Sequence, residues 1–392
     1  MEGIEQGRPG RMAALLTLAV ALGIGVAAME VGLRLALNPS DFMQATLVDD
    51  PVLGQRIAPG TSGHDALGYR NAQVPAKARV VAIGDSHTYG VSAPRDGSWP
   101  QQLSARLGEP VYNLGLGGFG PLQYLHLART TARDLQPKVV VVGFYFGNDL
   151  LDAYYIAHGR PHWQAWRGST RTVSGEASVP DEPPKRFGVL RDWLSRHSML
   201  YSVIRATVGR ALAGAGGRPS TSPAPAPDVR WAWSDPAAPA VRTEFKPLGR
   251  LHAIDLERPA VAEGLQIGQQ ALSEIAADVS RQGARLLVVL IPTKERAYCS
   301  HLRASGSVLP PAHARLCDAE TLAKTRLMEH LSQRRIEHVD ATPALEAGIA
   351  AHGQLYPPDD DGHEQAAGYA VIAGVVADAL TRPVPGAVML TR

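Results

Sequence analysis

Apolar residues along the chain gather into short runs, and amphipathic stretches with helical spacing lie between them. The apolar runs have the length and composition of strands buried in a parallel sheet, and they cover residues 78–83, 111–114, 138–146, 285–291 and 337–339. The helical stretches cover residues 99–107, 121–135, 260–282, 319–334 and 364–380. Strands that alternate with helices in this way predict an α/β fold with a parallel, doubly wound sheet.

A longer apolar run near the N-terminus has a different meaning. Residues 12–29 contain no charged residue, and Arg8 and Arg11 precede them. About 20 apolar residues span a bilayer as a helix, and basic residues before the span favour a cytoplasmic N-terminus and an exported body. We expect a cytoplasmic tail at residues 1–11 and a retained transmembrane signal-anchor at residues 12–37, in the inner (cytoplasmic) membrane. A cleaved signal peptide and a buried soluble helix are the alternatives.

Composition divides the remaining chain into segments. Residues 38–76 are rich in Pro, Gly and Asp and predict a stalk. A domain at residues 77–383 follows, with a large insertion at residues 151–257 and a C-terminal tail at residues 384–392. The insertion holds five of the six tryptophans, and its low-complexity run at residues 213–228 predicts a flexible loop.

Overall composition and cysteine usage narrow the class of protein. With 45% hydrophobic and 19% charged residues the chain is globular, and a net charge of +2 argues against nucleic acid as its partner. The two cysteines, Cys299 and Cys317, flank a loop-like stretch that a disulfide could close in an exported protein. Two unrelated buried thiols are the alternative. No metal and no cofactor are expected.

Candidate chemistry follows directly after the predicted strands, where ligands bind in parallel sheets. Ser86, within Gly-Asp-Ser, follows the first strand, and the first amides of the next helix could face an oxyanion there. Asn148 follows the third strand, and its side-chain amide could donate to the same oxygen; for either residue, helix capping is the alternative. His363 stands after the acidic turn 359–361 and could act as a base that a carboxylate orients, with an isolated surface histidine as the alternative. The glycines at 115–120 read as G-x-G-x-x-G, but they follow the second strand and lack the acidic partner of a dinucleotide site.

Together these blocks resemble the SGNH hydrolase (GDSL-like esterase/acetyltransferase) superfamily, in its exported, membrane-anchored bacterial form. The residues that match, in the family's order, are Ser86, Gly118, Asn148 and His363. The resemblance covers residues 78–150 and 258–382, and it implies a flavodoxin-like three-layer α/β/α fold.

The resemblance also implies a role for each matching residue. Ser86 would be the nucleophile and His363 the general base. The carboxylate that orients His363 would be Asp360, at the family's usual three-residue offset; some membrane-linked relatives use a two-residue offset, which would give Asp361, and we prefer Asp360. The oxyanion hole would be formed by the amides of Ser86 and Gly118 and the side chain of Asn148.

Three further residues are possible substrate contacts. His87 follows the nucleophile, where packing or capping is the alternative role. Lys294 and Glu295 belong to IPTKERAY at residues 291–298, which is similar to a stretch of polysaccharide O-acetyltransferases. They could line the cleft, or they could form an internal salt bridge.

The expected function is that of a serine-dependent esterase or O-acyl (acetyl) transferase, which acts on an acylated glycan outside the cytoplasm through an acyl-enzyme. Sequence does not separate hydrolase from transferase, because both share the acyl-enzyme. Alternatives are a non-catalytic glycan-binding or assembly component of the same fold, and a lipase or thioesterase. The membrane is an expected partner through the N-terminal helix, and the periplasm is the expected compartment.

Overall fold

The computed structural model describes residues 10–168, 188–214 and 226–382. The predicted C-terminal tail and most of the predicted cytoplasmic tail and low-complexity run lie outside the described residues. The described chain divides into two units. Residues 10–46 and 188–214 form the smaller unit, and residues 47–168 and 226–382 form the larger one.

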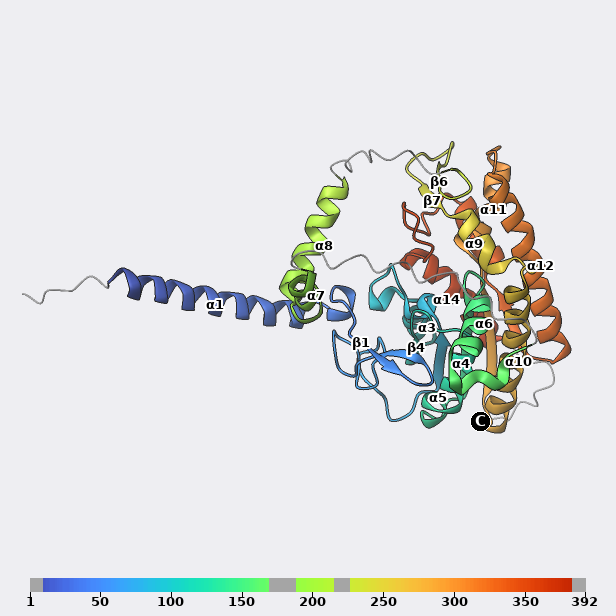
Figure 1. The fold of residues 1–392 in the computed structure, drawn as a ribbon, viewed down its shortest axis with the longest axis horizontal. Coiled ribbons are helices and arrows are strands. Elements are labelled where there is room, and N and C mark those ends of the chain that lie inside the picture. Colours follow the sequence, from blue (N-terminus) through green and yellow to red (C-terminus); the bar gives the residue numbers. More distant parts are fainter. Residues whose placement is uncertain (1–9, 169–187, 215–225, 383–392) are drawn as a thin grey trace, which may run out of the picture. The chain divides into compact units, whose positions relative to one another are not determined.

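A five-stranded parallel sheet forms the centre of the larger unit (Figure 1). Its strands are β3 (Val80–Gly84), β4 (Val111–Gly115), β5 (Val139–Tyr145), β8 (Arg285–Ile291) and β9 (Glu337–Asp340). Their order in the sheet, β4-β3-β5-β8-β9, is the flavodoxin-like order. The predicted α/β class with a parallel sheet is therefore confirmed. The chain leaves β3 for the edge strand β4 and returns to pair β5 on the other side of β3, so the winding reverses at β3.

Helices cover both faces of this sheet and give a three-layer structure. On one face α4 (Pro121–Arg129), α6 (Asp149–Gly159) and α10 (Pro259–Arg281) pack together. On the other face α3 (Trp99–Leu107) packs on α14 (Ala366–Thr381), and they share one core with alternate sheet residues such as Val80 and Ala82. The remaining helices of the larger unit are α2 (Ser86–Tyr89), α5 (Thr131–Asp134), α9 (Pro247–Ile254), α11 (Lys294–Ala304), α12 (Pro311–Gln333) and α13 (Thr342–Ala350).

Two glycines at strand ends allow α2 to lie directly across the edge of the sheet. A Cβ on Gly84 would collide with the Thr88 side chain, and a Cβ on Gly115 would collide with the backbone of Thr88 and Tyr89. The glycine of the Gly-Asp-Ser motif is therefore required by the close approach of the helix that Ser86 begins.

The prediction of a stalk at residues 38–76 is corrected by the structure, because the chain belongs to the larger unit from Leu47 onward. A hairpin of β1 (Leu47–Asp50) and β2 (Gly54–Ile57) is followed by turns whose polar side chains are buried. Arg70 Nη1 donates to the Gly90 carbonyl at 2.7 Å, and Asn71 Nδ2 donates to the Asn113 carbonyl at 2.9 Å. The segment rich in Pro, Gly and Asp thus forms turns that support the strand ends.

The insertion predicted at residues 151–257 is divided between the two units. Its first part, α6 and the 3-10 helix Pro161–Trp166, and its last part, the hairpin of β6 (Trp231–Ser234) and β7 (Arg242–Phe245) with α9, belong to the larger unit. Its middle part, α7 (Gly188–His197) and α8 (Met199–Gly214), belongs to the smaller unit.

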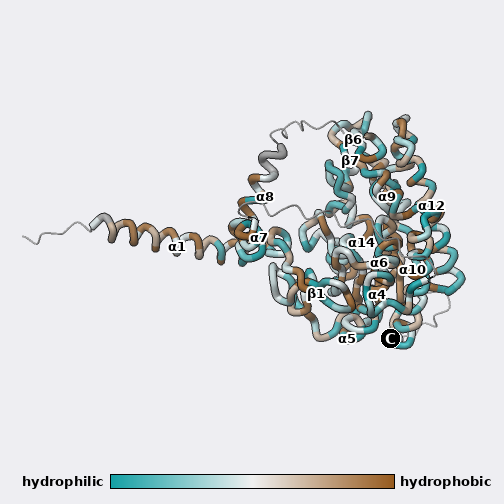
Figure 2. Tube along the Cα trace, in the orientation of Figure 1, coloured by the Kyte–Doolittle hydropathy of each residue, from teal (hydrophilic) through white to brown (hydrophobic). Residues whose placement is uncertain are grey.

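The smaller unit is built on α1 (Arg11–Ala36). Its segment Met12–Ala36 is long and apolar enough to cross a membrane, with a mean hydropathy of 2.3 in its most apolar window, and none of that window is buried. Figure 2 shows the hydrophobic colour along most of this helix. A signal sequence would pass the same test.

A disulfide links α11 to α12 in the larger unit. It joins Cys299 and Cys317, as predicted, and the described residues contain no free cysteine. The loop between them is thereby closed at its base.

Candidate active site

A chain of hydrogen bonds joins the two motifs that lie furthest apart in the sequence. Ser86 Oγ lies 2.8 Å from His363 Nε2, and His363 Nδ1 lies 2.5 Å from Asp361 Oδ1. An ionised carboxylate only accepts hydrogen bonds, so Nδ1 carries the proton and Nε2 is left to accept from the serine hydroxyl. Groups in this arrangement can act as a nucleophile, a base and a group that orients the base.

The structure places Asp361, and not the preferred Asp360, beside His363. Asp361 Oδ1 also accepts the backbone N–H of His363 at 3.1 Å, so a two-residue turn brings the carboxylate to the ring. Asp360 Oδ2 instead pairs with Arg230 at 2.6 Å and Lys246 at 2.9 Å. Both cations come from the insertion, and the three-residue offset that favours Asp360 takes no account of them.

Neighbouring hydrogen-bond donors favour the ionised form of Asp361. Partial burial raises its pKa, but hydrogen bonds from the His363 ring and the Ser92 hydroxyl outweigh that effect, and the pKa lies below its ordinary value. The carboxylate therefore stays ionised and can stabilise a positive charge on His363. Nothing in the local sequence around Ser92 signals this contact.

Lys294 and Glu295 lie beside the loop that carries Asp361 and His363. Lys294 is fully buried, and its Nζ donates to the carbonyls of Asp359 at 2.9 Å and Asp361 at 2.8 Å. Glu295 is also buried and accepts the backbone N–H of Lys246 at 2.9 Å. Lys294 thus fixes the loop, Glu295 holds the backbone at Lys246, and neither side chain is exposed to a substrate in this structure.

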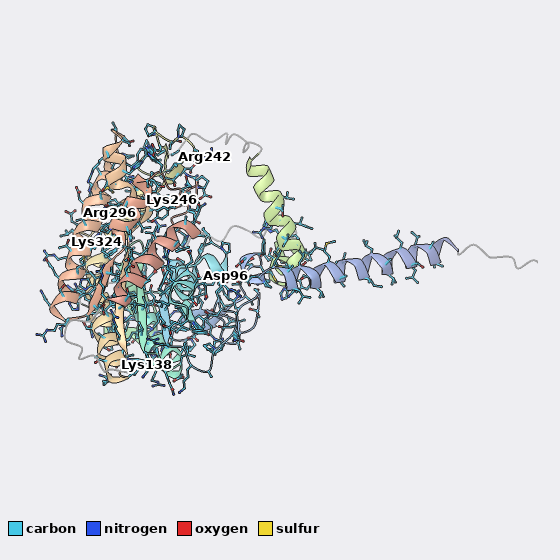
Figure 3. All side chains as sticks on the ribbon, turned by 180° about the vertical axis from the view of Figure 1, so that it is seen from behind. Asp96, Lys138, Arg242, Lys246, Arg296 and Lys324 are labelled. Carbon is cyan, nitrogen blue, oxygen red and sulfur yellow. A yellow bond between two sulfur atoms is a disulfide. The ribbon has the colours of Figure 1, made fainter. Side chains whose placement is uncertain are left out.

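Lys246 also shows where this loop lies in the molecule. Figure 3 shows Lys246, which pairs with Asp360, and Lys138, directly before β5, at opposite ends of the larger unit. The acidic loop therefore lies at the carboxyl end of the strands, where the sequence predicts the chemistry.

His87 is buried behind the site and does not reach its surface. Its side chain is 1% exposed, its Nδ1 lies 2.7 Å from Glu364 Oε2, and its ring lies against Tyr145 with centroids 3.6 Å apart. Burial raises the pKa of Glu364 to about 8, and burial lowers the pKa of His87 to about 3. At neutral pH both groups are uncharged, and Glu364 donates its hydrogen to Nδ1. The pair ties the residue after Ser86 to the residue after His363.

Glu364→Gln is expected to alter how stability depends on pH. Because the folded pKa of about 8 lies above the ordinary 4.5, the carboxyl stabilises the fold fully below pH 4.5, and this contribution is lost as pH rises toward 8. Gln keeps a donor to His87 and does not titrate. Thermal denaturation from pH 5 to pH 9 should show the melting temperature falling less steeply in the variant than in the wild type. Parallel curves would contradict the raised pKa.

The second and third blocks lie near the same edge of the sheet. Gly84 pairs with Gly115 on β4 and with Gly143 on β5, so the loops that carry Gly118 and Asn148 leave the sheet beside Ser86. Gly118 is exposed and has φ +79°, a conformation that favours glycine. Among the described residues, no hydrogen bond joins Gly118 or Asn148 to Ser86.

Asn148 is held by a residue that the motif does not include. Its Nδ2 donates to Asp152 Oδ2 at 2.5 Å, one turn further along α6. The amide nitrogen has two hydrogens, so one remains for a ligand. Asp152 also packs against Gly120, where a Cβ would meet the Asp152 side chain at 2.9 Å. The four-residue spacing on a helix is the only sequence signal for this partnership.

Asp152→Ala is expected to lower kcat about 10- to 100-fold with little change in KM, because Asn148 would lose the partner that aims its amide. Steady-state kinetics on a small acetyl ester measure the effect, with circular dichroism to verify folding. Asp96→Ala is the matched control, since the Asp96 side chain is 80% exposed (Figure 3). Equal kinetics in both variants would contradict the positioning role.

Among the residues that the structure describes, two groups of side chains have the composition of metal ligands. In the first, Cys299 and Cys317 are joined in the disulfide and offer no thiolate beside His313. In the second, His301 Nε2 and His352 Nδ1 each lie 2.9 Å from Asp235 Oδ2. Two hydrogen bonds to one carboxylate oxygen account for this second group.

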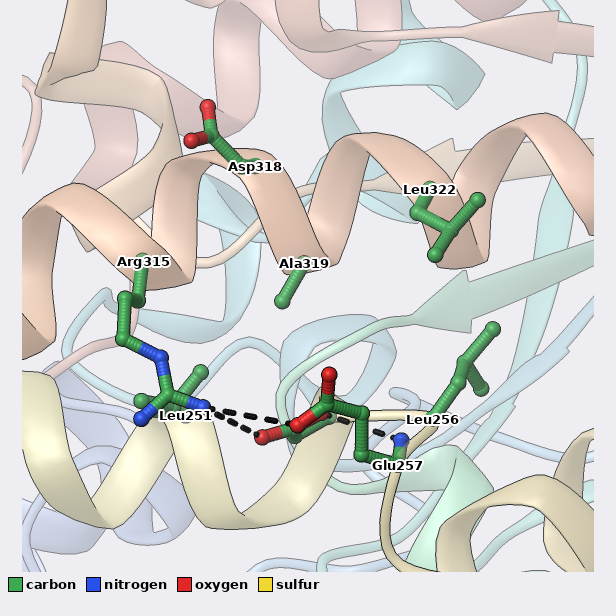
Figure 4. A pocket seen from close by; sticks show the side chains of 8 residues that line it. Leu251, Leu256, Glu257, Arg315, Asp318, Ala319 and Leu322 are labelled. Atoms are coloured by element: carbon green, nitrogen blue, oxygen red, sulfur yellow. Dashed lines mark hydrogen bonds and ion pairs between the residues drawn. The ribbon is translucent and has the colours of Figure 1, made fainter.

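A pocket of about 420 Å³ lies between α9 and α12, and Figure 4 shows it. Leu251, Ala319 and Leu322 give it an apolar wall, and Arg315 pairs with Asp255 across it at 3.2 Å. Its lining does not include Ser86, Gly118, Asn148 or His363, so we do not assign it to the candidate active site.

Comparison with known proteins adds one family match. Residues 252–389 match the family described as an SGNH hydrolase-like domain, acetyltransferase AlgX. The match includes His363 and Asp361, whereas Ser86 and Asn148 lie outside it. No curated protein sequence matches the chain.

Solved structures with similarity to the chain are distant. A GDSL-like lipase from Bacteroides thetaiotaomicron is 11% identical with a TM-score of 0.33, covering 77% of this chain and 87% of its own. TesA is 14% identical with a TM-score of 0.36, covering 77% and 97%. A carbohydrate esterase family 2 enzyme with a carbohydrate-binding domain from Corynascus thermopiles is 12% identical with a TM-score of 0.36, covering 79% and 68%.

At such TM-scores these likenesses carry no argument about activity. The sheet order and the family match are independent of them. On that basis residues 252–389 are similar to an SGNH hydrolase-like domain, and the sheet that they help to build has the flavodoxin-like strand order.

Proposed function

We propose that the protein is a serine esterase or O-acyltransferase that moves small acyl groups, acetyl above all, on a glycan. The observation that carries the proposal is the hydrogen-bonded chain from Asp361 through His363 to Ser86. The match to an acetyltransferase family model supports the choice of acyl chemistry.

The first half-reaction follows from the positions of these groups. His363 Nε2 accepts the proton of Ser86 as Oγ attacks the ester carbonyl, and Asp361 stabilises the imidazolium that forms. The amides of Ser86 and Gly118 and the free N–H of Asn148 would stabilise the oxyanion. Collapse of the intermediate breaks the ester C–O bond, the imidazolium protonates the leaving alcohol, and the acyl group stays on Ser86.

The second half-reaction decides between hydrolase and transferase. His363, neutral again, removes a proton from water or from a sugar hydroxyl, whose oxygen then attacks the acyl-enzyme. Water yields a free acid and a sugar hydroxyl yields a new ester, and Ser86 regains its proton in both cases. The same residues serve both outcomes.

Incubation with a soluble acetyl ester and an unacetylated glycan tests the proposal. Acetate release and acetylated glycan are measured by mass spectrometry, in the wild type and in Ser86→Ala. We expect at least one product from the wild type and neither from the variant. Acetate release that survives Ser86→Ala would contradict the proposal.

Chain-length dependence distinguishes this function from that of a lipase or thioesterase. Turnover of a homologous ester series is expected to fall steeply beyond short acyl groups. A rise toward long chains would favour the lipase or thioesterase alternative.

We also propose an extracytoplasmic location with α1 as a retained membrane anchor. The apolar segment Met12–Ala36 supports the anchor. The disulfide between Cys299 and Cys317 is consistent with an oxidising compartment such as the periplasm.

A further inference from the structure

Outside α1, exposed apolar side chains are concentrated on α7 and α8. Five large ones, each more than half exposed, lie within residues 188–209: Val189, Leu190, Trp193, Ile204 and Val208. The larger unit carries only six exposed ones over its described residues, 47–168 and 226–382. Large apolar side chains exposed at this density along one segment are typical of an interaction site. We refer to α7 and α8 together as the hairpin, and to these five residues as the apolar face of the hairpin.

The apolar face follows from the helical period of both helices. At about 100° per residue, Val189, Leu190 and Trp193 fall within one arc of α7 of about 100°, and the buried Ser195 points away from it. On α8, Ile204 and Val208 lie about 40° apart, with the buried Ser202 on the opposite side. Both helices therefore expose an apolar side; the buried side carries Ser195 on α7, and Ser202 with Met199 on α8.

Basic residues accompany this face. Residues 188–209 contain the arginines Arg191, Arg196 and Arg205 and a single acidic residue, Asp192. A positive helix pair with exposed apolar residues and a tryptophan has the composition of segments that lie in the interface of a bilayer. Its charge is complementary to the phosphate groups of lipids.

The hairpin is fastened to the C-terminal end of α1. The Glu30 carboxylate accepts the backbone N–H groups of Met199 at 2.7 Å and Leu200 at 2.9 Å, and so caps α8. Arg34, paired with Glu30 at 2.7 Å, donates to the His197 carbonyl at 2.7 Å. Figure 1 shows α7 and α8 beside this end of α1. The two charges that interrupt the apolar run of α1 are thus used to hold the hairpin where the span would leave the membrane.

We propose that the apolar face of the hairpin inserts into the interfacial layer of the membrane that α1 crosses, with its arginines at the lipid phosphates. The proposal rests on the proposed role of α1 as a membrane anchor. A helix in this position buries its apolar side about 5–10 Å into the headgroup and acyl boundary. The chain then returns to the membrane in the middle of what the sequence presents as an insertion.

Site-specific fluorescence on the full chain tests the proposal. The only two cysteines form the disulfide, so an introduced cysteine is the single free thiol for an environment-sensitive dye. Val189→Cys and Val208→Cys report on the hairpin, and Leu22→Cys reports on α1. Val308→Cys, 90% exposed in the larger unit, is the matched control. Each protein is reconstituted in vesicles of phosphatidylethanolamine and phosphatidylglycerol that contain lipids with a doxyl quencher near the headgroup or near the chain end.

We expect the shallow quencher to act most strongly at positions 189 and 208, and the deep quencher to act most strongly at position 22. The dye at position 308 should not be quenched by either lipid. Quenching at 22 without quenching at 189 or 208 would overturn the hairpin proposal and leave the anchor intact. A blue-shifted but unquenched dye at 189 and 208 would also overturn it, since protein would then cover the face. No quenching at 22 would instead refute the anchor on which the proposal rests.

Discussion

Ser86→Ala and His363→Ala are each expected to lower kcat by about 10⁶-fold, to the same residual level. Their side chains form one hydrogen-bonded unit, with Ser86 Oγ 2.8 Å from His363 Nε2. Without the base the hydroxyl keeps its proton, and without the hydroxyl the base has nothing to activate, so the two losses do not add. Steady-state assays on an activated acetyl ester measure kcat for the wild type, the two single variants and the double variant.

Matched controls separate this effect from misfolding. Ser300→Ala removes an exposed serine hydroxyl on α11, and His338→Ala removes an imidazole on β9 whose Nδ1 lies 2.9 Å from the Ile336 carbonyl. Both controls should keep wild-type turnover. A double variant much slower than either single variant would contradict the view that Ser86 and His363 act as a unit.

Asp361→Asn is expected to lower kcat by about 10⁴-fold, whereas Asp360→Asn should change it less than about threefold. An amide at 361 can donate to Nδ1, which would favour the tautomer with the proton on Nε2 and remove the acceptor that Ser86 needs. Asp360 contacts Arg230 and Lys246 on the partly exposed side of the turn, where ion pairs contribute about 0–1 kcal/mol to stability.

The same pair of variants gives the comparison its own control, because the two substitutions are chemically identical and one residue apart. Kinetics and melting temperatures are measured side by side. A larger loss of kcat in Asp360→Asn would return the orienting role to Asp360 and would mean that the loop rearranges when substrate binds.

Strands buried on both faces could be predicted from sequence almost residue by residue. The run at 285–291 and the helix at 99–107 match β8 and α3 in full, because continuous apolar runs and amphipathic spacing are local signals. The helix predicted at 121–135 is instead broken into α4 and α5 at Thr130, whose backbone is not helical with φ −122° and ψ −99°. No local pattern marks that break.

The parts that sequence could not predict depend on contacts between distant segments. His87 and Glu364 are 277 residues apart, and only their packing reveals that His87 is a buried partner and not a substrate contact. Asp360 is diverted from His363 by Arg230 and Lys246, more than 100 residues away along the chain. The segment 47–76 has the composition of a linker, but the side chains of Arg70 and Asn71 within it bond to the backbone around the strand ends.

Labelling of the full chain with a fluorophosphonate tests the central claim most directly, with the modified residue located by mass spectrometry. An activated serine attacks the phosphorus and retains it as a stable adduct. We predict a single adduct on Ser86, which is lost in His363→Ala and strongly slowed in Asp361→Asn. A folded wild-type protein that gives no adduct on Ser86, or an adduct that persists in His363→Ala, would contradict a serine enzyme and bring the non-catalytic glycan-binding alternative forward.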